Sequence, residues 1–436
     1  MASLKEAAKQ IFHDTLAAID IPAALRRKLD RTGSQIRCGG QTIDLATFEV
    51  ILVLSVGKAA CATARGLLDA LAPDFTATGI LVAPAVPPAD LPNFVRFVGG
   101  HPVPNEDSLN AGSVALELLR NCNERSLIFF LLSGGGSALM EAPLYEDVAL
   151  EDVQALNRVL VTCGAPIDEV NAVRKHLSAI KGGRLAAAAP AAMKITLGVS
   201  DVPQGRESAL ASGPTLPDPT TCDDVYRVVE KYRILDNLPA PIRARIAARE
   251  LEETPKEGHP AFARAHFELL LGVNDLFAAA RTAAEAQGFT VTCDNASDDW
   301  PLAKAADHLL KTLTHLKKQN DGARVCVIAD GEVSSPVTGP GVGGRNSAFV
   351  LNCVEKIAGR SVAVLSAGTD GIDGNSPAAG AVADGLTHGR SIMSGLDYTE
   401  FFRRSDAYSF FRLLDDAIET GPTGNNLRDL RILLAE

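Results

Sequence analysis

The chain has 436 residues, more than one ordinary hydrophobic core requires, so we expect two domains. Its composition, 46% hydrophobic and 22% charged, is typical of a globular protein. A formal net charge of −11 argues against nucleic acid or an anionic membrane as a partner.

The N-terminal stretch "MASLKEAAKQIFHDTLAAI" predicts an amphipathic helix with acidic residues, unlike a signal or transit peptide. No apolar run reaches membrane-spanning length. The eight cysteines are scattered singly without a C-x-x-C pair, which favours reduced thiols over disulfides or zinc ligation. These features predict a cytoplasmic protein.

Short apolar runs alternate with helical patterns through the first half. The predicted strands are residues 49–56, 78–84, 94–100, 127–133 and 193–202. The runs are continuously apolar, which is typical of a parallel sheet covered by helices on both faces. The fold class is therefore α/β.

The second half repeats this rhythm, with apolar runs at residues 267–273, 289–293, 323–330 and 361–368 and a helix over 301–318. A charge-rich helical stretch separates the halves. We predict a first domain over residues 1–245, a linker over 246–265 and a second domain over 266–436.

The most distinctive turn is "LIFFLLSGGGSALM", in which a buried strand meets three glycines and then a helical pattern. Free backbone N–H groups at such a turn would bind a phosphate or a carboxylate. A tight turn that needs glycine only for its backbone angles is an equal alternative.

Other polar clusters also follow predicted strands, where ligands bind in parallel α/β sheets. They are residues 55–60, 99–105, 200–205, 329–346 and 366–377. Gly-rich loops, cations and carboxylates at one sheet edge suit a phosphorylated ligand. Lys58 follows a glycine but is not part of a Walker A motif, because Leu52 and Ala59 stand at required motif positions.

The segment "GPGVGG" (339–344) matches G-x-G-x-x-G, yet it lies about nine residues beyond its strand and contains Pro340. A phosphate-covering loop or a plain surface loop explains it better than a dinucleotide turn. Arg345 follows at the expected start of a helix, and its forked donors suit a carboxylate or a phosphate.

A basic run, "NAVRKHLSAIKGGRLA" (171–186), is interpreted first as a solvated helical face. His176 within it is structural or positions substrate. The carboxylates that could hold a metal are Asp201, Asp330, Glu332, Asp370, Asp373 and Asp384. Each could equally cap a helix or a turn.

With these blocks assembled, the sequence resembles the class II glycerate kinases, the DUF4147/MOFRL family. The blocks are "VGKAA", "GGHPVPN", "LLSGGGSALM", "NAVRKHLSAIKGGRLA", "SDVPQG" with "ASGPT", "VTGPGVGGRN" and "SAGTDGIDGNSPAAGAVAD". The resemblance implies a Rossmann-like N-terminal domain, a smaller C-terminal α/β (MOFRL) domain and an active site in the cleft between them. It also implies Mg²⁺-dependent phosphorylation of D-glycerate by ATP at the 2-hydroxyl, giving 2-phosphoglycerate and ADP.

Carried onto this chain, the resemblance places the essential cations at Lys58 and Arg345. The nucleotide loop falls on Ser133, Gly134, Gly135, Gly136 and Ser137. We assign His101, Arg174 and Asp201 to substrate, and Asp201, Asp370 and Glu332 to Mg²⁺. Both a monomer and a homodimer remain open.

Two rival functions fit the sequence less well. An NAD(P)H-dependent hydroxypyruvate reductase requires a dinucleotide turn, and the one literal match is badly placed. A binding protein without catalysis would not require both Lys58 and Arg345. Phosphoryl transfer, by contrast, depends on positioning and charge neutralisation, which several anion-binding loops supply.

Overall fold

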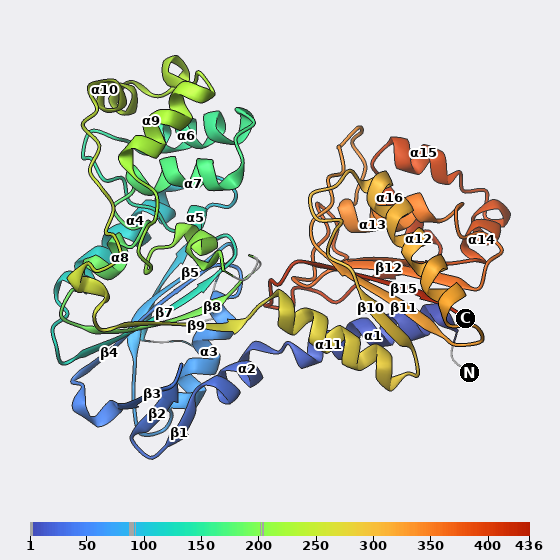
Figure 1. The fold of residues 1–436 in the computed structure, drawn as a ribbon, viewed down its shortest axis with the longest axis horizontal. Helices are drawn as coiled ribbons and strands as arrows, with labels where there is room; N and C mark the ends of the chain where they lie inside the picture. The colour runs from blue at the N-terminus through green and yellow to red at the C-terminus, as the bar shows by residue number, and fades with distance from the viewer. Residues whose placement is uncertain (1–2, 87–90, 92, 201, 203–204) are drawn as a thin grey trace. The chain divides into compact units, whose positions relative to one another are not determined.

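The computed structural model describes residues 3–86, 91, 93–200, 202 and 205–436. The chain forms two compact units, one of Ile21–Gly272 and one of Met1–Asp20 together with Val273–Glu436 (Figure 1). This is the predicted α/β class.

The unit of Ile21–Gly272 contains, within its described residues, a six-stranded sheet in which every pair is parallel. Across the sheet the strands are β6 (Phe94–Val98), β5 (Thr78–Ala83), β4 (Val50–Val56), β7 (Ser126–Ser133), β8 (Met193–Val199) and β9 (Ala265–Leu271). Every residue of β7 is buried. The strands β4, β5, β7 and β8 are thus covered on both sides, as predicted, whereas the edge strand β6 is partly exposed.

Helices cover both faces of this sheet (Figure 1). Leu54, Val82 and Phe130 pack on one face against α4 (Glu106–Arg120). Side chains alternate along a strand, so the intervening residues face the other side, where α3 (Ala60–Leu71) lies over β4, β5 and β7. Also in this unit are α2 (Ile21–Lys28), α5 (Gly136–Leu139), α8 (Arg184–Ala187) and an antiparallel sheet of β1 (Asp30–Thr32), β2 (Gln35–Cys38) and β3 (Gln41–Asp44).

A helical layer is inserted among the later strands of the same unit. It contains α6 (Leu150–Thr162), α7 (Ile167–His176), α9 (Cys222–Lys231) and α10 (Ala240–Ala248), the upper helices of that unit in Figure 1. Val153, Leu160, Val173, Val229 and Ile242 belong to a hydrophobic cluster of their own. This layer therefore has its own small core.

The other unit is built on a mixed sheet. Its strands, all in described residues, run in the order β10 (Thr290–Cys293), β11 (Val325–Asp330), β15 (Asp429–Ala435), β12 (Val362–Gly368), β13 (Gly380–Asp384) and β14 (Ala417–Ile418). Only the β10–β11 pair is parallel. The β–α rhythm predicted the neighbouring strands but not β15, which enters antiparallel between β11 and β12.

Helices also cover this second sheet. Among them, α12 (Leu302–Gln319), α13 (Arg345–Cys353) and α16 (Ala407–Leu413) share one hydrophobic cluster with alternate strand residues. α11 (Val273–Ala286) packs with α1 (Leu4–Ala18). Shorter helices α14 (Thr387–Met393) and α15 (Tyr398–Arg403) complete the unit.

The division differs from the predicted ranges of 1–245, 246–265 and 266–436 at two places. Helix α1 contacts β12, β13 and β15, because its buried face of Leu4, Ile11 and Phe12 covers that sheet. Strand β9, placed in the second domain by its position in the chain, pairs with β8 in the first sheet. The expected linker therefore connects two elements of one unit.

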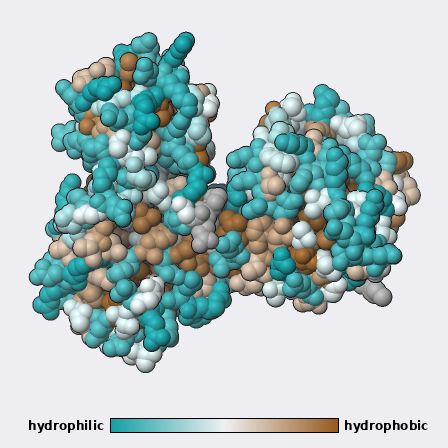
Figure 2. Space-filling view, viewed as in Figure 1, coloured by the Kyte–Doolittle hydropathy of each residue, from teal (hydrophilic) through white to brown (hydrophobic). Residues whose placement is uncertain are grey.

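No helix in the described part of the chain is long and apolar enough to cross a membrane. On the face shown in Figure 2, each unit presents mostly hydrophilic residues, and smaller groups of hydrophobic residues are scattered among them.

Candidate functional site

The predicted turns after β4 and β7 interlock at the carboxyl edge of the first sheet. The two strands are parallel neighbours with Val56 beside Leu132. The Lys58 N–H donates to the Gly134 carbonyl at 3.0 Å, and the Ala59 N–H donates to Ser133 Oγ at 3.0 Å. Lys58 and the glycine turn therefore belong to one constellation, as expected for strands that end together.

Two glycines in these turns are required by their surroundings. Gly57 has φ +129°, and a Cβ there would lie 2.1 Å from Ser133 Oγ. Gly135 has φ +84°, and a Cβ would lie 3.0 Å from His101 Cδ2. At both positions the positive φ and the close approach therefore disfavour a side chain.

The helix that follows the glycines is shorter than the sequence pattern indicates. Helix α5 is four residues long and starts at Gly136. Such a short helix has little dipole, so any affinity of the turn for an anion would rest on its backbone N–H groups.

His101 meets the same turn from the loop after β6. Burial, and then the charge of Lys58, lower the pKa of its imidazole. An imidazole that stays neutral beside a lysine can accept or donate a hydrogen bond without adding charge. Lys58, Gly135 and His101, predicted from three separate blocks, are thus brought together.

A hydrogen-bonded chain joins two further blocks to the glycine turn at this edge. Ser137 Oγ lies 2.8 Å from Ser212 Oγ, which donates to Asn171 Oδ1 at 3.2 Å. Ser212 and Asn171 are buried. Sequence reasoning did not single out either residue, although both lie in blocks quoted above, "ASGPT" and "NAVRKHLSAIKGGRLA".

Of the residues assigned to substrate, Arg174 is described in the structure and Asp201 is not. Arg174 donates from Nε to Asn157 Oδ1 at 3.0 Å, on α6. Burial lowers its pKa, and nearby Glu141 raises it. These contacts face the helical layer. Asp201 lies outside the described residues.

The basic run of 171–186 is not a solvated face, and that interpretation was wrong. Lys175 and Lys181 are 4% and 2% exposed. Lys175 Nζ bonds Asp218 Oδ1 at 3.1 Å, and Lys181 pairs with Glu141. Two of the basic side chains in this run therefore form buried ion pairs.

Arg345, in the other unit, lies at the first position of α13 between two carboxylates. Its Nε donates to Asp429 Oδ2 at 2.5 Å, and its Nη1 donates to Glu332 Oε2 at 2.7 Å. Burial lowers the pKa of the guanidinium, but its pairing with Asp429 and Glu332 outweighs burial and raises it. Asp429 was not predicted: in the sequence it stands between Arg428 and Leu430 and matches no motif that would mark it as a partner of Arg345.

The predicted acidic residues have distinct roles in this unit. Asp373 accepts the N–H groups of Gly344, Asn346 and Ser347 and so caps α13. Asp384 accepts the Leu386 N–H at 3.0 Å and the Thr387 hydroxyl at 3.1 Å, in the turn just before α14. These two satisfy backbone donors rather than presenting free oxygens.

Asp330, Asp370 and Glu332 lie at strand ends. Asp330 is fully buried, and burial raises its pKa; its Oδ2 accepts from Arg428, whereas its Oδ1 has no hydrogen-bond partner among the described residues. Asp370 follows β12 and accepts the Ile372 N–H at 3.1 Å. A Cβ on Gly368 would lie 2.9 Å from Asp370 Oδ1 and 3.5 Å from Asp429 Oδ1, so these carboxylates are neighbours.

The G-x-G-x-x-G segment does not form a strand-to-helix turn. The Gly341 N–H donates to the Arg404 carbonyl at 3.0 Å, and the Val342 N–H donates to Asp406 Oδ1 at 2.9 Å. The loop is therefore packed on α15 and α16, unlike a dinucleotide fingerprint.

Known proteins resemble the chain over most of its length. Residues 7–247 match a family model described as a domain of unknown function, DUF4147, and residues 325–429 match the MOFRL family. A protein of Thermotoga maritima named D-glycerate 2-kinase is 33% identical over 395 residues, which are 90% of this chain and 92% of that one.

Two further matches are informative. The crystal structure of a glycerate kinase from Thermotoga maritima superposes with a TM-score of 0.84 at 33% identity, covering 99% of each chain. A protein of Agrobacterium vitis, provisionally named a hydroxypyruvate reductase, is 35% identical over 392 residues, 88% of this chain and 86% of that one. The family models and the long matches agree, and the chain belongs to the DUF4147/MOFRL family of class II glycerate kinases.

Proposed function

We propose that the chain is a glycerate 2-kinase, which transfers the γ-phosphoryl group of ATP to the 2-hydroxyl of D-glycerate and yields 2-phosphoglycerate and ADP. The observation that carries the proposal is the interlocking of Lys58, the triple-glycine turn and His101 at one sheet edge, in a chain whose relatives are named glycerate kinases.

The triple-glycine turn would bind nucleotide phosphates. The backbone of Gly134, Gly135 and Gly136 can approach oxygens closely, because no side chain intervenes. Ser133 has a supporting role instead, since its Oγ accepts the Ala59 N–H. The Ser137 hydroxyl remains a candidate hydrogen-bond donor to a nucleotide phosphate, and its contact with Ser212 Oγ holds it in place.

Lys58 would neutralise the phosphoryl group in transfer, whose charge is spread over three oxygens. His101, beside the same turn, would contact glycerate as a neutral hydrogen-bonding group. Asp201 and Arg174 remain proposed substrate residues. Because Arg174 donates to Asn157 on α6, it would have to break this hydrogen bond to contact substrate directly, or else position substrate indirectly through α6.

Arg345 would bind an anionic oxygen of the substrate or of the phosphate. Asp429 is 5% exposed at its side chain and holds the guanidinium firmly, whereas Glu332 is 45% exposed. Glu332 is therefore the partner that an incoming anion would replace.

Mg²⁺ is expected to accompany ATP, and the acidic strand-end loops fit it chemically. Carboxylate oxygens are its preferred protein ligands, and Asp330 Oδ1 is buried without a partner among the described residues. Asp370 and Glu332, which lie with Asp330 at strand ends of one unit, would hold the ion; Asp201, also assigned to Mg²⁺, lies outside the described residues. When bound, Mg²⁺ would neutralise phosphate charge.

The reaction is tested by incubating purified protein with D-glycerate, ATP and Mg²⁺ and identifying the product by phosphorus NMR. We expect 2-phosphoglycerate; 3-phosphoglycerate or no product would contradict the proposal. Oxidation of NADH by hydroxypyruvate, measured in parallel, tests the reductase alternative, which the packed loop of Gly339–Gly344 does not favour.

A further inference from the structure

His176 ends α7 and is completely buried, yet one of its ring nitrogens is unsatisfied. Its Nδ1 lies 2.8 Å from the Ala172 carbonyl oxygen. A carbonyl can only accept, so Nδ1 carries the hydrogen and Nε2 presents a lone pair. Nε2 has no hydrogen-bond partner among the described residues.

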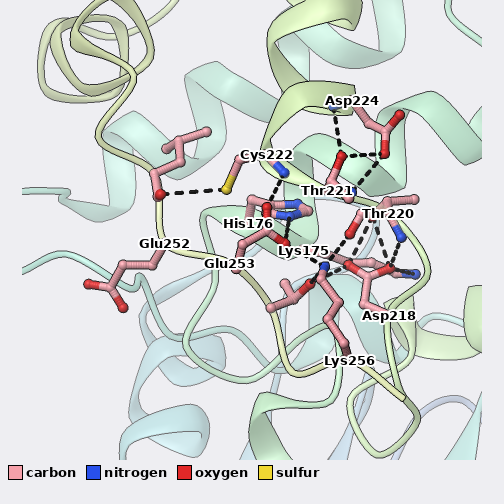
Figure 3. Close-up of polar contacts among 12 residues, drawn as sticks. Lys175, His176, Asp218, Thr220, Thr221, Cys222, Asp224, Glu252, Glu253 and Lys256 are labelled. Carbon is pink, nitrogen blue, oxygen red and sulfur yellow. Dashed lines mark hydrogen bonds and ion pairs between the residues drawn. The ribbon is translucent and has the colours of Figure 1, made fainter. Parts of the chain in front are cut away.

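Two further potential ligand atoms, from Cys222 and Glu253, lie near this lone pair (Figure 3). Cys222 is the first residue of α9, and Glu253 lies on the segment after α10. Nε2 of His176, Sγ of Cys222 and a carboxylate oxygen of Glu253 all lie within 4.8 Å of one another. Glu253 Oε2 is 4.0 Å from Nε2, so two electron-pair donors face each other with no hydrogen between them.

We propose that His176, Cys222 and Glu253 bind a structural Zn²⁺ ion. Nitrogen, sulfur and oxygen ligands in one cluster are the set that zinc accepts tetrahedrally. A ligating histidine typically donates its other ring N–H to a carbonyl or a carboxylate, as His176 does to Ala172. Water would supply the fourth ligand from the side of Glu253, whose side chain is 48% exposed.

Binding would require small, specific rearrangements. Ligand atoms around a tetrahedral zinc lie roughly 3.3–3.7 Å apart, so Glu253 would move slightly towards His176. The Cys222 thiol, which contacts the Leu251 carbonyl at 3.5 Å, would lose its proton to solvent as the metal–sulfur bond forms. Thiolate and carboxylate together would then balance the charge of the ion.

Existing contacts already hold Glu253 near this position. Its Oε1 accepts the Cys222 N–H at 2.5 Å, and its Oε2 pairs with Lys256 at 2.7 Å. Lys256 also donates to Thr254 Oγ1 at 2.7 Å and to the Thr220 carbonyl. The positive charge of Lys256 would repel the metal ion. Its hydrogen bonds to Thr254 Oγ1 and the Thr220 carbonyl would allow it to move away from Glu253 and still be hydrogen-bonded.

The bound ion would fasten together three segments that are distant in the chain: the end of α7, the start of α9 and the segment around Glu253. Helix α7 also carries Asn171, which bonds Ser212 at the edge of the first sheet. The site would therefore stabilise the helical layer and would take no part in the transfer itself. Its ligands lack the short spacing of zinc motifs, which is why the cysteine pattern indicated no zinc.

The test is equilibrium dialysis of the full chain against Zn²⁺ with the bound metal counted, and titration with Co²⁺ followed by its thiolate charge-transfer absorption. Cys222→Ser is the test variant, and Cys163→Ser is its control, because that thiol is also partly buried and bonds a carbonyl. Glu253→Gln is a second test variant, which we expect to remain folded because the Glu253 side chain is half-exposed. Circular dichroism checks that every variant is folded.

We expect one equivalent of Zn²⁺ and the cobalt–thiolate band in the wild-type chain and in Cys163→Ser. Cys222→Ser should lose both, and Glu253→Gln should bind about tenfold more weakly or worse. A wild-type chain without bound metal, or equal binding by folded Cys222→Ser, would overturn the proposal. Neither result bears on the kinase assignment, which uses other residues.

Discussion

At the scale of residues, the candidate site depends on close contacts that permit little variation. Gly135 combines a left-handed backbone with a near contact to His101, and Arg345 is held by two carboxylates. The sequence predicted which residue types gather at strand ends. It could not predict the pairing of Arg345 with Asp429, because 84 residues separate them.

Gly135→Val is expected to weaken ATP binding while the protein stays folded. Valine disfavours φ +84°, and its Cβ would meet His101. Calorimetric titration with ATP measures the effect. Gly164→Val is the matched control, because Gly164 has φ +80° and open space around its Cα. Equal ATP affinity in the two variants would mean that the triple glycine is only a turn.

Arg345→Lys should lower kcat/KM by at least about tenfold, because an ammonium cannot reproduce the forked contact with Asp429 and an anion. Steady-state kinetics with glycerate and ATP checks this. Arg403→Lys, which alters an exposed pair with Glu400, should leave kcat/KM unchanged. The role of Arg345 would be refuted by unchanged kinetics in both variants.

At the scale of elements, continuous apolar runs were sufficient to predict the parallel strands β4, β5, β7 and β8. The same patterns could not place β15, since an antiparallel strand from the end of the chain enters the second sheet through non-local pairing. The start of α13 was predicted from Arg345, but Asp373 was predicted only as one of six carboxylates that could hold a metal or cap a helix or a turn. Asp373 supplies the cap of α13 from a loop 26 residues or more away.

Asp373→Ala should destabilise the unit that contains α13 by roughly 2–4 kcal/mol, because it leaves several buried N–H groups without an acceptor. Urea unfolding measures the free-energy change. Asp397→Ala removes a more exposed cap, on α15, and should cost about 1 kcal/mol. If Asp373→Ala cost no more than this control, Asp373 would not be the main cap of α13.

At the scale of the whole molecule, order along the chain is a poor guide to the units. Helix α1 packs on the sheet that contains the last strand, and α10 returns the chain to the first sheet through β9. The amphipathic pattern predicted that α1 would bury one face. It could not indicate which sheet would receive it, because any apolar surface satisfies that pattern.

Phe12→Ala should destabilise the unit of residues 1–20 and 273–436 by about 3–5 kcal/mol, because Phe12 is fully buried. Amide hydrogen exchange should accelerate in β12, β13 and β15 and stay unchanged in β4, β7 and β8. His13→Ala, at the exposed neighbouring position, serves as the control. Faster exchange in the first sheet instead would contradict the assignment of α1.

The most direct test of the proposed active site is the turnover number of Lys58→Ala, measured with D-glycerate, ATP and Mg²⁺ beside calorimetric ATP binding. Lys231→Ala, at an exposed pair with Glu169, is the control. Because Lys58 would act mainly on the charge of the transition state, we predict a loss of about a hundredfold or more in kcat, with the fold and ATP binding retained. A kcat close to that of the wild type and of Lys231→Ala would contradict the placement of phosphoryl transfer at this edge of the sheet.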